Sequence, residues 1–255
     1  MDQKKAAISV QNVVKYFDDR KVLDGVSLDI YPGETFVIMG GSGCGKSTLL
    51  RHMIGAIQPD AGKVYIGEKD LTAMSEEGRE KVKRRFGMSF QSAALLDFLT
   101  VEENVSLPLK EHTNLDPEII KMIVKMKLSL VGLQGSENLM PSMLSGGMKK
   151  RVGLARAIAM DPEIVFYDEP TSGLDPVVCA VIDNLIMDLS KKLLLTSVVV
   201  THNMESVFRI ADRVAMLYNG RVLEIGTSEE IKNSKNEIVQ QFIQGKLEGP
   251  IQLND

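Results

Sequence analysis

TFVIMGGSGCGKSTLLRHMIGAI, residues 35–57, decides the fold of this chain. Its first five residues are apolar or β-branched and predict a buried strand, and a glycine-rich loop follows them at once. From Lys46 onward the apolar residues recur at helical spacing. The stretch therefore predicts a strand, a loop and a helix in direct succession, as in a parallel α/β sheet.

The loop at residues 40–48 has the spacing of a phosphate-binding loop. Its glycines let successive backbone N–H groups curl around a β-phosphate, and the positive end of the following helix adds to the attraction. Lys46 is expected to reach the β- and γ-phosphates, and the Ser47 hydroxyl to bind Mg²⁺. The candidate nucleotide-binding residues of this loop are Gly40, Gly41, Ser42, Gly43, Cys44, Gly45, Lys46, Ser47 and Thr48.

The composition is that of a globular protein without a general affinity for nucleic acid. Of 255 residues, 44% are hydrophobic and 25% charged, which is enough for a core, and a net charge of -4 gives no basic field. No signal-peptide core follows the N-terminus, and the most apolar run, residues 193–200, is far shorter than the roughly 20 residues of a membrane helix. We therefore expect work at a membrane to be done through partners. Cys44 and Cys179 lack metal-site spacing, so we expect a reducing compartment and neither a disulfide nor a zinc site.

The rest of the chain alternates strand and helix patterns. Residues 8–17 and 26–33 predict strands, and further strand patterns flank a mostly helical region at residues 93–160. Asn219-Gly220 predicts the turn of a late β-hairpin. This order predicts an α/β fold with a largely parallel sheet and a helical insertion between its central strands. The insertion carries an apolar stripe at helical spacing, made of Ile119, Ile123, Met126 and Leu130.

A second candidate site feature is IVFYDE at residues 164–169, a buried strand that ends in two carboxylates. Parallel sheets open their ligand crevice at this end of the strands. Asp168 is expected to hold the Mg²⁺ shell, and Glu169 to orient and deprotonate the attacking water, because phosphoryl transfer to water depends on positioning and charge neutralisation. His202 follows another strand pattern, where it could hydrogen-bond a γ-phosphate; the alternative is a structural role, which is the usual one for a lone histidine. With Lys46, Glu169 and His202 are the candidate catalytic residues.

A further anion-binding feature lies in the helical region, at Ser145-Gly146-Gly147. The helix that starts here offers unpaired N–H groups and the positive end of its dipole. One nucleotide cannot easily be held by two remote loops of one chain, so this segment is expected to face the nucleotide of a second copy. ATP would then be buried between two subunits, and loss of the γ-phosphate would open the dimer. Taken alone, the stretch would favour an ordinary serine-capped helix.

These elements, in this order, resemble the ATP-binding cassette (ABC) ATPases over nearly the whole chain. The resemblance implies an α/β P-loop NTPase fold of the ABC type, with a RecA-like, mostly parallel sheet core, an antiparallel β subdomain and an inserted α-helical subdomain. The matching motifs are the phosphate loop, Gln91 in MSFQ, LSGGM at 144–148, Asp168-Glu169, SGLD at 172–175 and His202.

The resemblance also assigns roles. Gln91 would bind Mg²⁺ as a metal ligand and transmit the state of the Mg²⁺ site to a membrane partner. Asp175 would lie in the loop that links the two nucleotide sites. Phe17 would stack on adenine, with Tyr16 as the alternative because the register of KYF leaves both open.

The implied organisation is a single ABC domain followed by a short tail. The domain would span residues 1–240, with its helical subdomain at roughly 93–160. The segment 236–255 is amphipathic at first and breaks at Gly249-Pro250, and we expect the tail, residues 241–255, to pack on its own domain, with a partner contact as the alternative.

Longer stretches resemble the ATPase subunits of bacterial Mla/Mce phospholipid-transport systems, which move lipid between the inner and outer membranes. They are SFQSAALLDFLTVEENVSLPLKEHT at 89–113, LMPSMLSGGMKKR at 139–151 and QFIQGKLEGP at 241–250. The resemblance implies ATP and Mg²⁺ as cofactors and a place on the cytoplasmic face of the inner membrane. The implied partners are a second copy of the chain in an ATP sandwich, a permease dimer, a periplasmic Mce-domain lipid-binding protein and often a small STAS-domain protein.

Two positions depart from the common ABC pattern. Met148 replaces the glutamine that usually follows LSGG, and Gly173 replaces the alanine of SALD; both suit the Mla-like subset. The alternatives are the ATPase of another importer or exporter, a soluble ABC ATPase acting on DNA or the ribosome, and a small-molecule P-loop kinase. The soluble ATPase would normally carry two cassettes or a long coiled coil, and the kinase has no use for LSGGM or His202.

Overall fold

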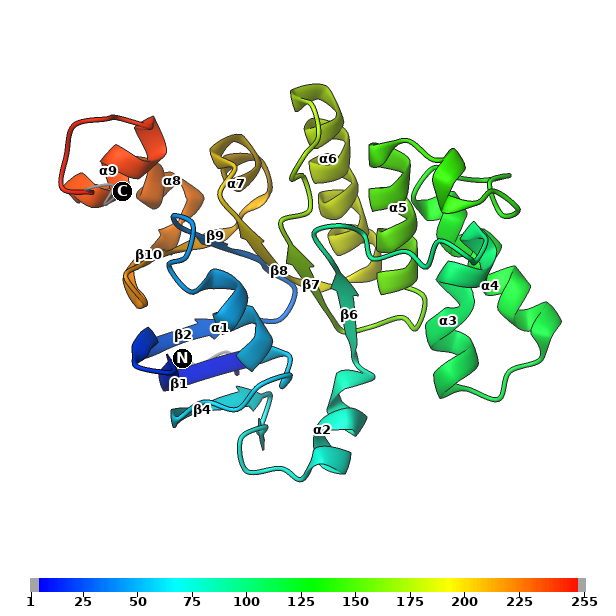
Figure 1. The fold of residues 1–255 in the computed structure, drawn as a ribbon, viewed down its shortest axis with the longest axis horizontal. Coiled ribbons are helices and arrows are strands. Elements are labelled where there is room, and N and C mark those ends of the chain that lie inside the picture. The colour runs from blue at the N-terminus through cyan, green and yellow to red at the C-terminus, as the bar shows by residue number, and fades with distance from the viewer. Residues whose placement is uncertain (1–4, 252–255) are drawn as a thin grey trace. The chain divides into compact units, whose positions relative to one another are not determined.

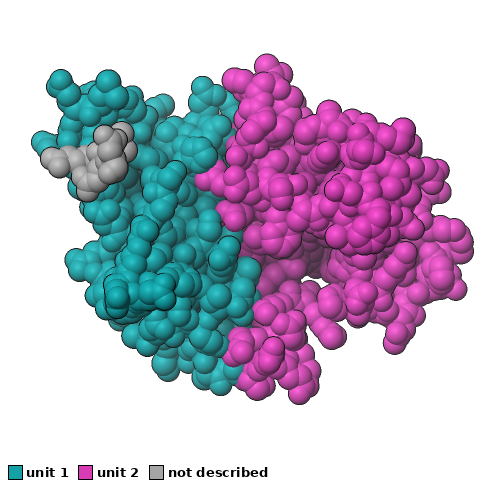
Figure 2. Space-filling model, in the orientation of Figure 1, with its two compact units in different colours: residues 1–74, 200–255 teal, residues 75–199 magenta. Residues whose placement is uncertain are grey.

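The chain folds into two compact units in a computed structural model that describes residues 5–251 (Figure 2). Of these, residues 5–74 and 200–251 form unit 1 and residues 75–199 form unit 2. Among the residues that the structure describes, no helix is both long and apolar enough to cross a membrane.

Unit 1 contains an antiparallel sheet in the order β2-β1-β4-β5 (Figure 1). Its strands are β1 (Ile8–Phe17), β2 (Arg20–Ile30), β4 (Ala61–Ile66) and β5 (Lys69–Asp70). β1 turns directly into β2, with Phe17 paired to Arg20. β2 therefore begins earlier than the alternating pattern at residues 26–33 predicted, because pairing with the whole of β1 extends it.

The strand that precedes the phosphate loop is β3 (Thr35–Met39), which is buried along its whole length. It pairs in parallel with β9 (Arg213–Tyr218), and β9 turns at Asn219-Gly220 into the antiparallel β10 (Arg221–Thr227). Both turn residues have positive φ, 46° and 74°, as a tight hairpin requires, so the predicted hairpin is confirmed.

The helices of unit 1 include α1, which follows the phosphate loop directly and completes the predicted strand, loop and helix. The bounds are α1 (Lys46–Met53), α7 (Met204–Ile210), α8 (Ser228–Lys232) and α9 (Glu237–Gln244). α9 ends at Gly245, and the buried Gln241 side chain bonds the backbone of Lys246 and Ile251. The tail is thus held against α9 as far as Ile251, and residues 252–255 lie outside the described part of the chain.

Unit 2 pairs two parallel strands, β6 (Phe86–Ser89) and β7 (Ile164–Asp168). A third strand, β8 (Thr196–Thr201), runs across the division between the units. Helices α3, α4 and α5 pack against one another (Figure 1). The helices of unit 2 are α2 (Glu76–Lys83), α3 (Val101–His112), α4 (Pro117–Leu130), the 3-10 turn η1 (Pro141–Met143), α5 (Gly146–Ala157) and α6 (Pro176–Leu193).

Helix α4 exists where its apolar stripe predicted it, but the stripe is not the most buried face. Ile119 and Met126 are 44% and 52% exposed and Ile123 and Leu130 are half-buried, whereas Ile120, Val124 and Leu128 are buried. Apolar residues occupy both faces of this helix, so periodicity alone cannot tell which face packs.

The α/β fold class is confirmed. Parallel pairing joins β3 to β9 and β6 to β7, while β1, β2, β4 and β5 form a separate antiparallel sheet. The helices stand between the parallel strands in chain order, as the alternating patterns predicted.

Candidate functional site

The phosphate loop joins β3 to α1, and its first glycine is required by close packing. Gly40 has φ +153°, and a Cβ there would lie 2.2 Å from the Leu217 carbonyl oxygen of β9. Gly45, with φ 107°, is the N-cap residue of α1. The loop therefore wraps tightly around the start of the helix, where backbone N–H groups and the helix dipole attract phosphate.

Lys46 is 8% exposed and its ammonium group lies over the loop. Nζ donates hydrogen bonds to the carbonyls of Gly40, at 2.8 Å, and Gly41, at 2.9 Å. The charge is thus held within the loop that is predicted to bind the β- and γ-phosphates.

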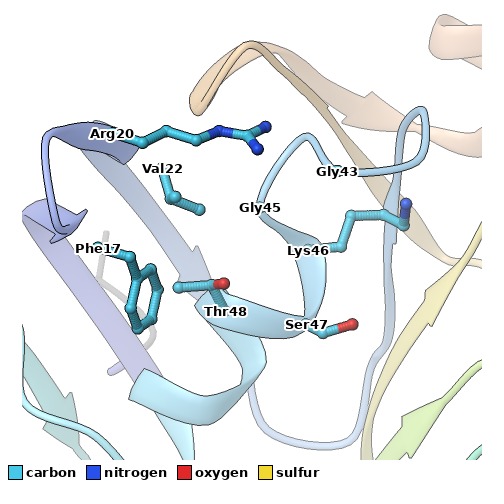
Figure 3. A pocket seen from close by; sticks show the side chains of 8 residues that line it. All are labelled: Phe17, Arg20, Val22, Gly43, Gly45, Lys46, Ser47 and Thr48. Atoms are coloured by element: carbon cyan, nitrogen blue, oxygen red, sulfur yellow. The ribbon is translucent and has the colours of Figure 1, made fainter.

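A cavity of about 260 Å³ opens beside the loop (Figure 3). Phe17 lines it and Tyr16 does not; the Tyr16 ring instead lies 5.3 Å from the Lys21 ammonium. In Figure 3 the Phe17 ring lies near the Thr48 side chain. The geometry places the aromatic surface of Phe17, from the end of β1, next to the phosphate loop. The cavity is lined by Phe17, Arg20, Val22, Gly43, Gly45, Lys46, Ser47 and Thr48.

Arg20 is a cavity residue that the sequence analysis missed. It lines this cavity and a second one of about 540 Å³, and Gly43 also lines both. Neighbouring cations are paired, since Lys21 and Arg221 both bind the Asp24 carboxylate, at 3.1 and 2.5 Å. The Arg20 guanidinium adds positive charge beside the phosphate loop. A cation at the first residue of a β-strand belongs to no motif that would have revealed this position.

Cys44 lies in the same loop and is a free thiol. Burial raises its pKa, and the charge of Lys46 opposes this only in part. The thiol is therefore protonated at neutral pH and is a poor nucleophile.

In unit 2, β7 ends at the two predicted carboxylates, Asp168 and Glu169. Glu169 is 9% exposed and has φ 47°, an unusual left-handed conformation for a residue other than glycine. Such a backbone turns the chain sharply at the end of the strand and sets the direction of the carboxylate.

Gln91 follows β6 in the same unit, and its Nε2 donates to the Ser172 hydroxyl at 3.4 Å. Lys150, which the sequence analysis did not single out, donates from α5 to the carbonyls of Gln91 and Glu169. Burial lowers the pKa of the Lys150 ammonium, and the charge of Glu169 opposes this shift. The structure therefore brings the predicted Gln91 and Glu169 together through a residue that only the fold reveals.

The predicted anion-binding segment forms the start of α5. Ser145 is the N-cap residue, and its hydroxyl accepts from the Met148 N–H at 3.3 Å. A Cβ on Gly147 would lie 2.8 Å from Val178 Cγ1, and one on Gly146 would lie 3.3 Å from Leu174 Cδ2. Gly147 thus allows this helix start to pack closely beside Val178 of α6, and Ser145 and Gly146 remain exposed.

Asp175 is the N-cap residue of α6, and its Oδ1 accepts from the N–H groups of Val177 and Val178, both at 3.0 Å. This carboxylate fixes the entry to α6 after the SGLD loop. His202 follows β8 directly and belongs to unit 1.

Each unit holds part of the predicted set. Unit 1 contains Phe17, the loop 40–48 and His202. Unit 2 contains Gln91, Ser145, Gly146, Gly147, Asp168, Glu169 and Asp175.

A glycine-rich phosphate loop after a parallel strand, with an aromatic-lined cavity beside it, defines a nucleotide-binding P-loop protein. The chain belongs to the ABC transporter family, whose sequence model matches residues 23–172. It is accordingly an ATP-hydrolysing enzyme with the ABC type of P-loop fold, and the resemblance noted in its motifs is confirmed.

Its relatives include phospholipid-transport ATPases. The intermembrane phospholipid transport system ATP-binding protein MlaF of Haemophilus influenzae is 42% identical over 246 residues, covering 96% of this chain and 93% of the relative. MlaF of Escherichia coli K12 is 40% identical, with 95% and 93% covered. The probable ribonucleotide transport ATP-binding protein mkl of Mycobacterium leprae is 39% identical over 98% of this chain and 72% of the relative.

Solved ABC cassettes share the fold. The dimeric structure of the bacterial ABC transporter cassette MJ0796 has a TM-score of 0.80 and 33% identity, covering 87% of this chain and 98% of that one. A dimeric post-hydrolysis state of the same cassette, bound to ADP and Pi, has a TM-score of 0.79 and 32% identity over the same shares.

Proposed function

We propose that this chain is the ATP-hydrolysing subunit of a transporter that moves phospholipid between the inner and outer membranes of a bacterium. The observation that carries the proposal is the match to two MlaF proteins, at 40–42% identity over 95–96% of this chain and 93% of theirs. A match of this extent runs through both units, so it is more specific than a shared phosphate loop.

ATP is proposed to bind along the cavity beside the phosphate loop. Phe17 stacks on adenine, which its place in the cavity lining supports over Tyr16. The backbone N–H groups of residues 40–48 hold the phosphates, and Lys46 binds the β- and γ-phosphates. Arg20 contributes further positive charge at the cavity wall.

The donor set fits Mg²⁺, which prefers oxygen ligands and uses few from the protein when it also binds phosphate. The proposed ligands are the Ser47 hydroxyl, the Asp168 carboxylate and Oε1 of Gln91. When bound, Mg²⁺ neutralises phosphate charge. Glu169 then orients the attacking water and accepts its proton, and His202 hydrogen-bonds the γ-phosphate.

Two copies are proposed to clamp two ATP molecules. Ser145, Gly146 and Gly147 of one copy would face the γ-phosphate bound by the other, and Asp175 would link the two sites. The exposed start of α5 and the dimeric solved cassettes support this arrangement. Hydrolysis removes the phosphate that both copies contact, so the dimer opens.

The proposed organisation is one ABC domain at residues 1–240, with a helical subdomain at about 93–160 and a partner contact available to the tail at 241–255. The proposed partners are a permease dimer, a periplasmic Mce-domain lipid-binding protein and a small STAS-domain protein. The chain would act at the cytoplasmic face of the inner membrane and would bind no nucleic acid.

The test is transport in liposomes. The chain is purified from native membranes in detergent with its hydrophobic partners, reconstituted, and supplied with ATP and labelled phospholipid. We expect lipid movement that stops with Glu169→Gln, which keeps ATP binding but loses turnover, and continues with Glu163→Gln, a control on the surface near the other end of β7.

Two outcomes would contradict the proposal. If ATP drove the movement of a labelled ribonucleotide but not of lipid, the transported substrate would instead be a ribonucleotide, as the name of the mycobacterial relative states. Recovery of an active chain from the soluble fraction without membrane partners would remove the transport role.

A further inference from the structure

Lys150 lies within reach of two carbonyls from distant segments of unit 2. It is 7% exposed, and its Nζ donates to the Gln91 carbonyl at 2.5 Å and to the Glu169 carbonyl at 3.3 Å. A buried ammonium group requires such partners, because its desolvation is costly. One side-chain atom therefore holds the main chain at both the candidate Mg²⁺ ligand Gln91 and the candidate base Glu169.

Both of these segments have strained backbones. Ala93 and Ala94, just after Gln91, have φ of 61° and 46°, and Glu169 has φ 47°. Non-glycine residues in left-handed conformations persist only where the surroundings hold them, and they cluster at functional sites.

Other residues of the same α5 face also hold the segment after Gln91. The Arg156 guanidinium donates to the carbonyls of Ala93 and Ala94, both at 2.7 Å. A Cβ on Gly153 would lie 3.3 Å from the Cβ of Ala93. Lys150 extends this contact by joining the loop after β6 to the end of β7.

We propose that Lys150 is a positioning residue for ATP hydrolysis, which keeps the side chains of Gln91 and Glu169 at a fixed separation by binding both main chains. This rests on the proposed roles of Gln91 as a Mg²⁺ ligand and Glu169 as the base. α5 begins after the Ser145 cap, so Lys150 and the proposed anion-binding helix start belong to the same helix. A second copy that docks on this helix start therefore meets the helix that sets the catalytic geometry.

The test uses the full chain in the assembly that hydrolyses ATP. Lys150→Met keeps the length of the side chain and removes its donors, Lys150→Arg keeps a donor, and Lys149→Met is the matched control one position earlier on the helix. Nucleotide affinity, kcat, KM and the Mg²⁺ concentration for half-maximal rate are measured for each.

For Lys150→Met we expect unchanged nucleotide affinity, because the phosphate loop lies in unit 1, and a fall in kcat of about tenfold or more, since small displacements of catalytic groups are costly. The Mg²⁺ requirement should rise by about threefold because the Gln91 loop is no longer held. Lys150→Arg should recover most of kcat and the normal Mg²⁺ dependence, and Lys149→Met should match wild type.

Equal kcat and Mg²⁺ dependence in Lys150→Met and Lys149→Met would overturn the proposal. So would a parallel loss of kcat and affinity, which would indicate a merely structural role. If Lys150→Met does not fold, Lys150→Leu, which also lacks a donor, is measured in the same way, and wild-type values there overturn the proposal. Turnover that survives Glu169→Gln would instead refute the proposed function.

Discussion

At the scale of single residues, Gly40 and Gly41 are neighbours with different requirements. Gly40 combines φ +153° with a close approach to the Leu217 carbonyl, whereas a Cβ on Gly41 would meet nothing within 4 Å. The phosphate-loop pattern names only the first as a defining glycine, and the packing of β9 against the loop explains why it is required.

We therefore predict opposite results for two alanine substitutions. Gly40→Ala should lower the free energy of unfolding by about 2 kcal/mol or more, because the new Cβ collides with backbone and φ is unfavourable. Gly41→Ala should change it by less than about 0.5 kcal/mol. Urea unfolding of both variants checks this, and equal midpoints would show that the loop relaxes around Gly40.

At the scale of elements, strong local signals predicted structure well. The apolar run before Gly40, the helical spacing after Lys46 and the Asn219-Gly220 turn each predicted an element that is present. Local patterns did not reveal the buried face of α4, the strained Ala93-Ala94 loop or the bridge made by Lys150. Each of these depends on contacts between segments that are far apart in the chain.

The start of α5 gives a prediction at this scale. Ser145→Arg should abolish ATP turnover while leaving nucleotide affinity of the single chain unchanged, because its proposed target lies on another copy and a bulky side chain blocks access to the helix N–H groups. It also removes a helix cap, worth about 1 kcal/mol. Fluorescent nucleotide binding and phosphate release measure the two effects.

Ser75→Arg is the matched control, since Ser75 caps α2 in the same way, accepting from the Gly78 N–H at 3.2 Å. The Ser75→Arg variant should lose a helix cap of similar value and keep the wild-type rate of ATP turnover. Weaker nucleotide binding by the isolated Ser145→Arg chain would place Ser145 at its own nucleotide instead.

At the scale of the whole molecule, the candidate site is divided between the units. Unit 1 supplies the phosphate loop and the Phe17 cavity, and unit 2 supplies the carboxylates, Gln91 and the α5 start. In the proposed dimer, Lys46 of one copy and Ser145 of the other serve the same ATP. A defect in either residue therefore disables every site of a homodimer.

Mixing two inactive proteins separates this arrangement from a self-contained enzyme. A Lys46→Ala copy paired with a Ser145→Arg copy has one site with both defects and one site with neither. Random mixing should thus restore about a quarter of wild-type turnover, because half of the dimers are mixed and each has one of its two sites intact. The measurement is phosphate release after mixing with ATP, with each variant alone as the control. No recovery, although a tag on one variant co-purifies the other and so shows mixed dimers, would mean that both residues act on the same copy's nucleotide or that one intact site cannot turn over alone.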